Sequence, residues 1–158
     1  MNTSRLIRCA ASAAVLALTS LAASAAEVWN LVTAASAPLA AGDVVIIAAS
    51  GFNFALSTNQ KTNNRDQASI TKDSANGTCV PSADVQTLTI CAGSSSGTFA
   101  FDTGAGYLYA PSTSSNYLKT QKTLDAKASW KISFDGSVAS IVSSDTAVHG
   151  IMQYNIFQ

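Results

Sequence analysis

The sequence predicts an all-β fold in which short antiparallel hairpins form a barrel-like or trefoil-like domain. Two observations indicate strands: apolar and polar residues alternate in several short segments, and a β-branched apolar run covers Asp43–Ala49. The third observation is that glycine-containing turns separate these segments while helix start and stop signals are nearly absent. Short strands at close spacing are typical of barrels and related closed β-folds.

The first 26 of the 158 residues have the pattern of a secretory leader. Arg5 and Arg8 form a basic start, an apolar run follows from Ala10, and Ala23-Ser24-Ala25 fits the cleavage pattern, which places the cut after Ala25 or Ala26. We therefore expect residues 27–158 to be one domain, secreted or periplasmic. The apolar run is short for a membrane span, and no later segment is a better candidate, so we expect no stable span in the mature chain.

The first predicted strands lie before residue 50. Residues 28–33 alternate, with Trp29 and Leu31 on one face. A connector over 34–42 contains Pro38 and Gly42, and the apolar run of Asp43–Ala49 follows as a buried strand. From residue 58 to 84 the chain is polar, which predicts loops with a short strand at 68–72.

The second half of the chain carries clearer patterns. Residues 84–91 alternate, and the Gly-Ser-Ser-Ser-Gly segment at 93–97 predicts a turn. The clearest hairpin covers Ser129–Val142, with Asp135-Gly136 as its two-residue turn. A weak repeat, Asn-aromatic-apolar followed by Thr and Gln, begins at Asn53 and Asn116, and "MQYN" near residue 155 is a third, decayed copy.

Two cysteines remain after leader removal, Cys79 and Cys91, with eleven residues between them. Export to an oxidising compartment predicts a disulfide between them. Closing so short a loop contributes about 3 kcal/mol in the chain-entropy model. There is no Cys-x-x-Cys pair and only one histidine in the chain, so we expect neither a metal site nor a cofactor.

The charge distribution argues against nucleic-acid binding. All nine acidic residues follow the leader, whereas Arg5 and Arg8 lie within it, so the mature chain is weakly acidic. Its lysines and Arg65 are dispersed along the sequence. A protein that neutralises phosphates needs a cluster of basic side chains, and this chain has none.

The segment Asp102-Thr103-Gly104 resembles the catalytic turn of an aspartic protease. Such an enzyme needs two carboxylates that share a proton, so this chain would have to act as a homodimer. The preceding apolar run, Thr98–Phe101, is short, and the segment that should pack behind the turn, Ala147–Gly150, contains a histidine. Gly104 and Gly106 fit a bend between two strands, and we expect the bend and a protein that is not an enzyme.

Three tyrosines form the candidate binding surface. Tyr107 and Tyr109 fall on one face of a strand, and Tyr117 follows. One interpretation is a platform on which sugar rings stack; the other is core packing with hydrogen-bonded hydroxyls. For the loop 63–66 a ligand or cation site is the alternative to a solvated loop, and for His149 a general base is the alternative to a surface residue; we favour the solvated loop and the surface residue. The candidate site comprises Tyr107, Tyr109, Asn116, Tyr117, Lys119 and Gln121.

Four stretches of the chain, in order, resemble secreted β-domains in large extracellular proteins of Bacteroidetes-type bacteria. They are Trp29–Ser50, Phe54–Arg65, Gly97–Gln121 and Ala128–Val142. Such domains occur beside nucleases, peptidases and other surface modules, and no catalytic residues are established for them. The resemblance implies an accessory role in adhesion, ligand binding or spacing. We expect the partner of the chain to be a carbohydrate or a cell-surface protein.

The chain departs from this family in two places. Family members continue with further aromatic-rich strands after the segment that corresponds to Ile151–Asn155, so the resemblance predicts a fold that is incomplete at its C-terminus. A structural remnant of a larger surface protein is therefore a third interpretation, beside the binding domain and the protease. The second departure is the Cys79 and Cys91 pair, which the family lacks.

Overall fold

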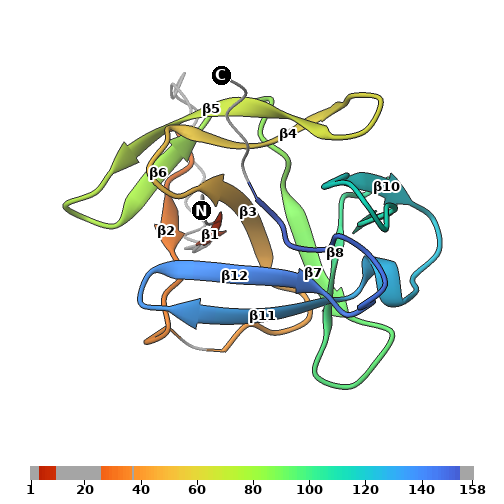
Figure 1. Ribbon diagram of the computed structural model, residues 1–158. Coiled ribbons are helices and arrows are strands. Elements are labelled where there is room, and N and C mark those ends of the chain that lie inside the picture. Colours follow the sequence, from red (N-terminus) through yellow and green to blue (C-terminus); the bar gives the residue numbers. More distant parts are fainter. Residues whose placement is uncertain (1–3, 10–25, 37, 154–158) are drawn as a thin grey trace, which may run out of the picture.

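A computed structural model of the protein describes residues 4–9, 26–36 and 38–153 (Figure 1). In these residues the chain forms twelve strands, all paired antiparallel, and one short 3₁₀ turn, so the prediction of an all-β fold is confirmed. The elements are β1 Ser4–Cys9, β2 Trp29–Leu31, β3 Val44–Ala49, β4 Phe54–Gln60, β5 Arg65–Asp73, β6 Thr78–Pro81, β7 Leu88–Ala92, β8 Phe99–Asp102, β9 Tyr107–Tyr109, β10 Lys119–Gln121, η1 Ala126–Ala128, β11 Trp130–Asp135 and β12 Val138–Ser143.

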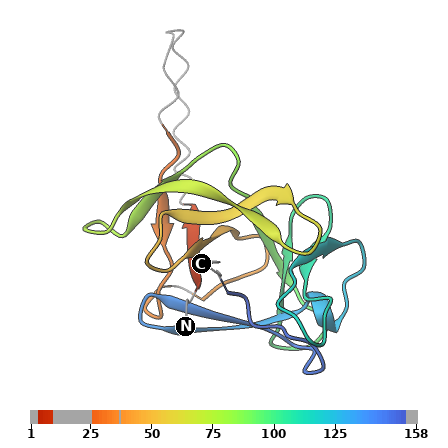
Figure 2. The same ribbon diagram turned by 45° about the horizontal axis from the view of Figure 1, so that its top comes forward.

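The strands form one strongly curved sheet in the order β10-β9-β8-β11-β12-β1-β2-β6-β5-β4-β3-β7. Two more pairings, β7 with β8 and β1 with β3, join strands that are not neighbours in this order. The β1–β12 and β8–β11 contacts are each a single residue pair, so the sheet curls back on itself without closing into a barrel. In Figures 1 and 2 the β4–β5 hairpin covers one side of the molecule and the β11–β12 hairpin the other.

Two hydrophobic clusters lie on either side of β3. The main cluster contains Trp130 and Phe101, whose ring centroids are 6.4 Å apart, and the second cluster surrounds Trp29. Successive side chains of a strand point to opposite faces. Val45 and Ile47 of β3 accordingly pack in the main cluster, while the alternate residues Ile46 and Ala48 pack in the second.

The buried strand predicted at 43–49 is confirmed as β3, in which Val45–Ala49 are all buried. The short strand predicted at 68–72 is confirmed as part of β5, but the prediction of loops over the rest of residues 58–84 is wrong, because β4, β5 and β6 occupy much of that segment. Only Ala68 and Ile70 of β5 are buried, and the residues between and around them are polar and either exposed or half-buried. A hairpin that buries only a few apolar residues shows little hydrophobic alternation in its sequence, although its strands are still joined by backbone hydrogen bonds.

The hairpin predicted at Ser129–Val142 is confirmed as β11 and β12, but its turn is shifted by one residue. Asp135 still pairs with Val138, so the two turn residues are Gly136 and Ser137 rather than Asp135 and Gly136. Gly136 has φ 56°, the left-handed conformation that the first position of such a two-residue turn requires.

The predicted disulfide is contradicted, because Cys79 and Cys91 are both free thiols. Cys79 lies buried on β6, which pairs with β2 and β5, whereas Cys91 lies on β7, which pairs with β3 and β8. The two cysteines therefore belong to strands that share no ladder. Their spacing in the sequence gave no information about this separation.

Part of the predicted leader lies in the sheet. Ser4–Cys9 forms β1, and the backbone of Ser4–Arg8 pairs with β3. Residues 10–25, which hold the apolar run, and the last two residues of the decayed repeat "MQYN" are outside the described residues. No helix in the described ranges is long and apolar enough to cross a membrane.

Candidate ligand-binding pocket

A pocket of about 620 Å³ lies where three segments of the chain meet, and we call it the hairpin pocket. One wall is the end of the β4–β5 hairpin, the second is the segment 110–118, and the third is the segment 149–153. Apolar side chains that line it include Ile47, Phe54, Leu56, Trp130 and Met152. Polar side chains that line it are Lys61, Thr62, Asn63, Asn64, Arg65, Asp66, Gln67, Asn116, Tyr117, His149 and Gln153.

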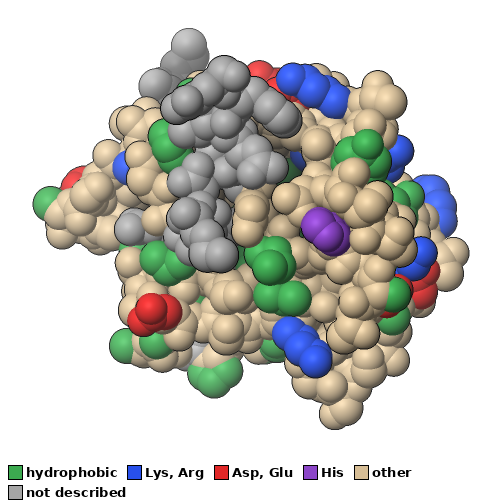
Figure 3. Space-filling model, in the orientation of Figure 1, with side chains coloured by type: hydrophobic (Ala, Val, Ile, Leu, Met, Phe, Trp, Pro, Cys, Tyr) green, Lys and Arg blue, Asp and Glu red, His purple; other side chains and the backbone are tan. Residues whose placement is uncertain are grey.

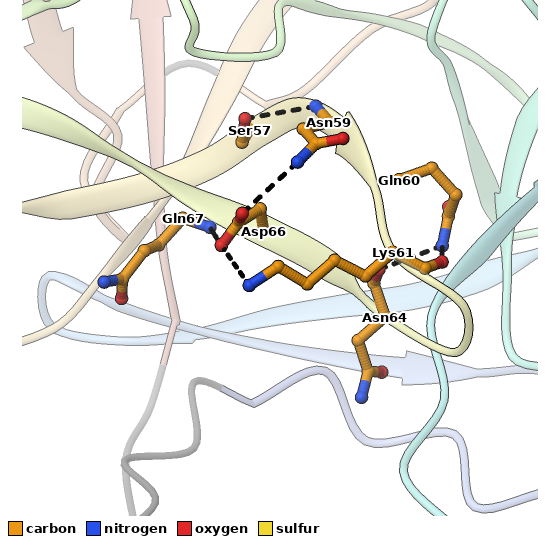
Figure 4. A network of polar contacts seen from close by, with 7 residues as sticks. All are labelled: Ser57, Asn59, Gln60, Lys61, Asn64, Asp66 and Gln67. Atoms are coloured by element: carbon orange, nitrogen blue, oxygen red, sulfur yellow. Dashed lines mark hydrogen bonds and ion pairs between the residues drawn. The ribbon is translucent and has the colours of Figure 1, made fainter.

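Asp66 holds the two strands of the β4–β5 hairpin together at this end (Figure 4). Its carboxylate accepts from Lys61 Nζ at 2.9 Å, from the Gln67 backbone at 2.9 Å and from Asn59 Nδ2 at 3.3 Å. The hydrogen bond from Lys61, followed by that from the Gln67 backbone, lowers the pKa of Asp66 below the ordinary aspartate value. The positive charge of Lys61 is thereby paired with a carboxylate of the same hairpin.

The tip of the hairpin is tied to the second wall of the pocket. The backbone N–H of Leu118 donates to Asn63 O and to Asn64 Oδ1, both at 3.1 Å. Gln60 Nε2 donates to Lys61 O at 2.7 Å and Asn64 O at 2.9 Å, which closes the tip on itself. The sequence "KTNNR", interpreted as a solvated loop, is therefore an ordered wall of the pocket.

Arg65 brings a positive charge to the pocket wall through contacts with neutral groups. Its Nη1 donates to Thr120 Oγ1 at 3.3 Å and its Nη2 donates to Gln86 Oε1, while its buried Nε has no hydrogen-bond partner among the described residues. Burial lowers the pKa of Arg65, but a guanidinium stays protonated in proteins. Gln86 is itself buried, and its Nε2 donates to Thr87 O at 2.7 Å and to Thr103 O at 3.3 Å.

His149 is exposed at the third wall of the pocket, and Figure 3 shows the single histidine of the chain (purple) at the surface. Its Nδ1 lies 3.3 Å from Asn116 Oδ1, and its backbone N–H donates to Ser112 O at 2.8 Å. The contact links the second and third walls of the pocket.

The residues predicted as a binding surface divide into two groups. Asn116 and Tyr117 line the hairpin pocket. Tyr107 and Tyr109 lie on β9 and stay half-buried, while Leu108 between them is fully buried in the main cluster. Gln121 and Lys119 of β10 pair directly opposite Tyr107 and Tyr109, respectively, so these four side chains share one face of the β9–β10 hairpin.

The two faces of the β9–β10 hairpin separate the two groups. Thr120 of β10 pairs with Leu108 and contacts Arg65, so this face points to the interior and the pocket wall. The tyrosine face is the opposite one, which places it away from the pocket. The Gln121 amide there donates to Thr123 O at 2.7 Å and to Asp125 Oδ1 at 2.9 Å, next to the start of η1.

The sequence favoured a solvated loop over a ligand site for residues 63–66 and a surface position for His149, and it gave no role to Lys61; the structure places all of them at the pocket. The feature of the sequence that could have indicated this pocket is the repeat. The copy at Asn53 precedes β4, the copy at Asn116 precedes β10, and both lie beside the pocket. A repeated Asn-aromatic pair at two strand starts indicates a shared local role. The spacing alone did not show that the two copies meet.

Asp102 stabilises its own turn between β8 and β9. Its Oδ1 accepts from the Gly104 N–H at 2.8 Å, and Thr103 Oγ1 donates to Gly106 O at 2.9 Å. Gly104 and Gly106 both have positive φ, as such a bend requires. Among the residues that the structure describes, no three His, Cys, Asp or Glu side chains are grouped to hold a metal ion.

Comparisons of the chain with protein-family models, with curated proteins and with solved structures find no match. The pocket has an apolar part that contains aromatic residues, several side-chain amides and one arginine whose hydrogen bonds within the described residues go to neutral groups.

Proposed function

We propose that this protein is an exported, non-catalytic binding domain and that the hairpin pocket holds a carbohydrate ligand. The volume of about 620 Å³ falls within the range of about 300–1,000 Å³ that is usual for small-molecule sites. Such sites combine an apolar lining with a few polar groups that fix orientation. The combination of Phe54 and Tyr117 with several amides in one pocket is the observation that carries the proposal.

The chemistry of the wall suits hydroxyl-rich molecules. A sugar hydroxyl both donates and accepts, and so does a side-chain amide, so Asn63, Asn116 and Gln153 can satisfy it in either sense. The aromatic rings offer a flat apolar surface to the C–H face of a sugar ring. Arg65 adds a positive charge, which favours an acidic sugar over a neutral one.

Export supports this assignment, because carbohydrate recognition at the cell surface or in the periplasm matches the leader predicted at residues 1–26. The resemblance to accessory β-domains of extracellular proteins points in the same direction. The protease interpretation has less support, since the Asp102 carboxylate is engaged in its own turn. The interpretation as a structural remnant predicts no ligand and is tested by the same experiment.

The test is a glycan array followed by calorimetric titration of the exported protein with the sugars that bind. We expect Tyr117→Ala and Asn116→Ala to weaken binding at least tenfold, which corresponds to about 1.4 kcal/mol. Tyr107→Ala and Tyr109→Ala are the matched controls, because these tyrosines lie on the other face of β9–β10 and should change affinity less than twofold. Absence of any glycan ligand, or equal losses in the two pairs of variants, would contradict the proposal.

A further inference from the structure

The place held by β1 is a slot with strands on both edges. On one edge β3 pairs with Ser4–Arg8 over five residues, from Ser4 opposite Ala49 to Arg8 opposite Val45. On the other edge lie β12, through Ser4 opposite Ala139, and β2, through residues 7–9. Leader removal would empty this slot and leave β2, β3 and β12 each without a partner on this edge.

The chain after β12 returns along the same edge of β12 that β1 uses. Ile151 forms an antiparallel bridge with Val142, the Ser143 N–H donates to Gly150 O at 2.8 Å, and the Met152 N–H donates to Ile141 O at 2.9 Å. Ser143, Ile141 and Ala139 are alternate residues of β12, so their backbone groups point to one edge, and β11 occupies the other. The returning segment and β1 therefore follow one line in space.

Continuing this ladder by one residue per position gives a definite register. Ile151 opposite Val142 puts residue 153 opposite Ser140 and residue 154 opposite Ala139. Ala139 is the residue that Ser4 now faces, and both segments run antiparallel to β12. Extended in this register, residues 154–158 would fall at the positions of residues 4–8, the five residues that pair with β3.

The side chains of residues 154–158 suit the slot. In this register Ile156 stands opposite Ile47 of the main cluster and Phe157 stands opposite Ile46 of the second cluster, and directly opposite residues share a face of the sheet. The position opposite Ile47 is now held by Leu6.

The charges differ in a way that favours the C-terminal segment. β1 places Arg5 opposite Ala48 and Arg8 opposite Val45, and both β3 residues are completely buried. The C-terminal segment places the neutral amides of residues 155 and 158 there. A sheet position opposite a buried residue suits a neutral side chain that can be hydrogen-bonded better than a charged one.

We propose that residues 154–158 take the place of β1 in the exported protein, as the strand between β3 and β12. While the leader is attached, β1 fills the slot; after its removal, the C-terminal segment completes the sheet. The exchange replaces the single β1–β12 pair by a continuous ladder along β12. The inference concerns the assembly of the sheet and does not depend on what the hairpin pocket binds.

Cross-linking in the leaderless chain tests the register. Directly opposite residues have Cα atoms about 4.5–5.5 Å apart, within the range that a disulfide spans. Ala49→Cys combined with Tyr154→Cys should therefore oxidise to an intramolecular disulfide, identified by the mass of the linked peptides. Ala49→Cys with Ile156→Cys is the control: two residues along a strand add about 7 Å, which is too far. No cross-link in the first pair, or equal cross-linking in both, would overturn the proposal.

A deletion series tests the exchange itself, by comparing the loss of residues 154–158 from the chain with its leader and from the chain that starts at Glu27. We expect the leaderless chain to lose at least 10 °C in melting temperature, and the leader-bearing chain to lose less than 3 °C, because β1 fills the slot. A synthetic peptide of residues 153–158 should restore the leaderless deletion, whereas the same peptide with Ile156→Asn and Phe157→Asn should not. Equal losses in the two chains, or no rescue by the peptide, would refute the inference.

Discussion

Replacing Gln86 by leucine should destabilise the protein through the polar groups that it leaves without partners. Gln86 is 8% exposed and bonds three groups: Arg65 Nη2, Thr87 O and Thr103 O. A hydrogen bond to a charged group contributes about 1.5–3 kcal/mol, and a buried polar group without a partner costs about 1–3 kcal/mol. Leucine has a similar volume, so the cavity term is small, and we expect a loss of about 3 kcal/mol in the free energy of unfolding.

The assay is urea unfolding followed by tryptophan fluorescence, with a thermal melt as a second measure. A loss of about 3 kcal/mol corresponds to a fall of about 10 °C in melting temperature for a domain of this size. Thr87→Ala is the matched control, because the Thr87 side chain is exposed and the Gln86 bond reaches only its backbone oxygen. If Gln86→Leu costs less than 0.5 kcal/mol, or no more than the control, the role assigned to Gln86 is wrong.

Three other predictions follow from turns, charge and thiols. Gly106→Ala should lower the urea midpoint more than Gly104→Ala: both have positive φ, but only at Gly106 would a Cβ lie 2.3 Å from a facing carbonyl oxygen; equal effects would contradict this. Because the pKa of Asp66 is lowered on folding, its contribution to stability is present above the ordinary aspartate value and is lost as pH falls through the folded value; NMR titration should show a midpoint below about 3.9, and a midpoint above it would refute the assignment. Burial raises the pKa of the Cys79 and Cys91 thiols, so both should be alkylated at pH 8 more slowly in the folded than in the unfolded chain. Cys91 should react faster than Cys79, because Cys91 is less buried. A disulfide between the two in a non-reduced sample would contradict the strand order.

The elements that sequence patterns predicted well are those with a strong apolar signal. β3 is an uninterrupted β-branched run, and β11 alternates Trp130, Ile132 and Phe134 with polar residues. Of the β4–β5 hairpin only the short strand at 68–72 was predicted, because the hairpin relies on backbone pairing and on a few buried residues such as Ala68 and Ile70. The pattern of apolar residues in the sequence does not reveal a pair of strands whose side chains are mostly polar on both faces.

The binding site was predictable in part, for a related reason. Asn116 and Tyr117 stood out because they combine an amide and an aromatic ring at a repeat. Arg65 and His149 come from segments far apart in the sequence, and the sheet order brings them to one pocket. The same order separates Cys79 from Cys91, so the sequence could neither assemble the pocket nor exclude the disulfide.

The position of β3 has a consequence for how the molecule unfolds. Because its alternate residues support different clusters, neither half of the core can melt while the other keeps its packing. If β3 shifted its register by one residue, each side chain would move to the opposite face of the sheet. Ile46 or Ala48 would then take the place of Ile47 in the main cluster, and the second cluster would change in the same way, so a misaligned fold would lose packing in both clusters. We therefore expect one cooperative unfolding transition, with the amide hydrogens of β3 among the last to exchange with solvent.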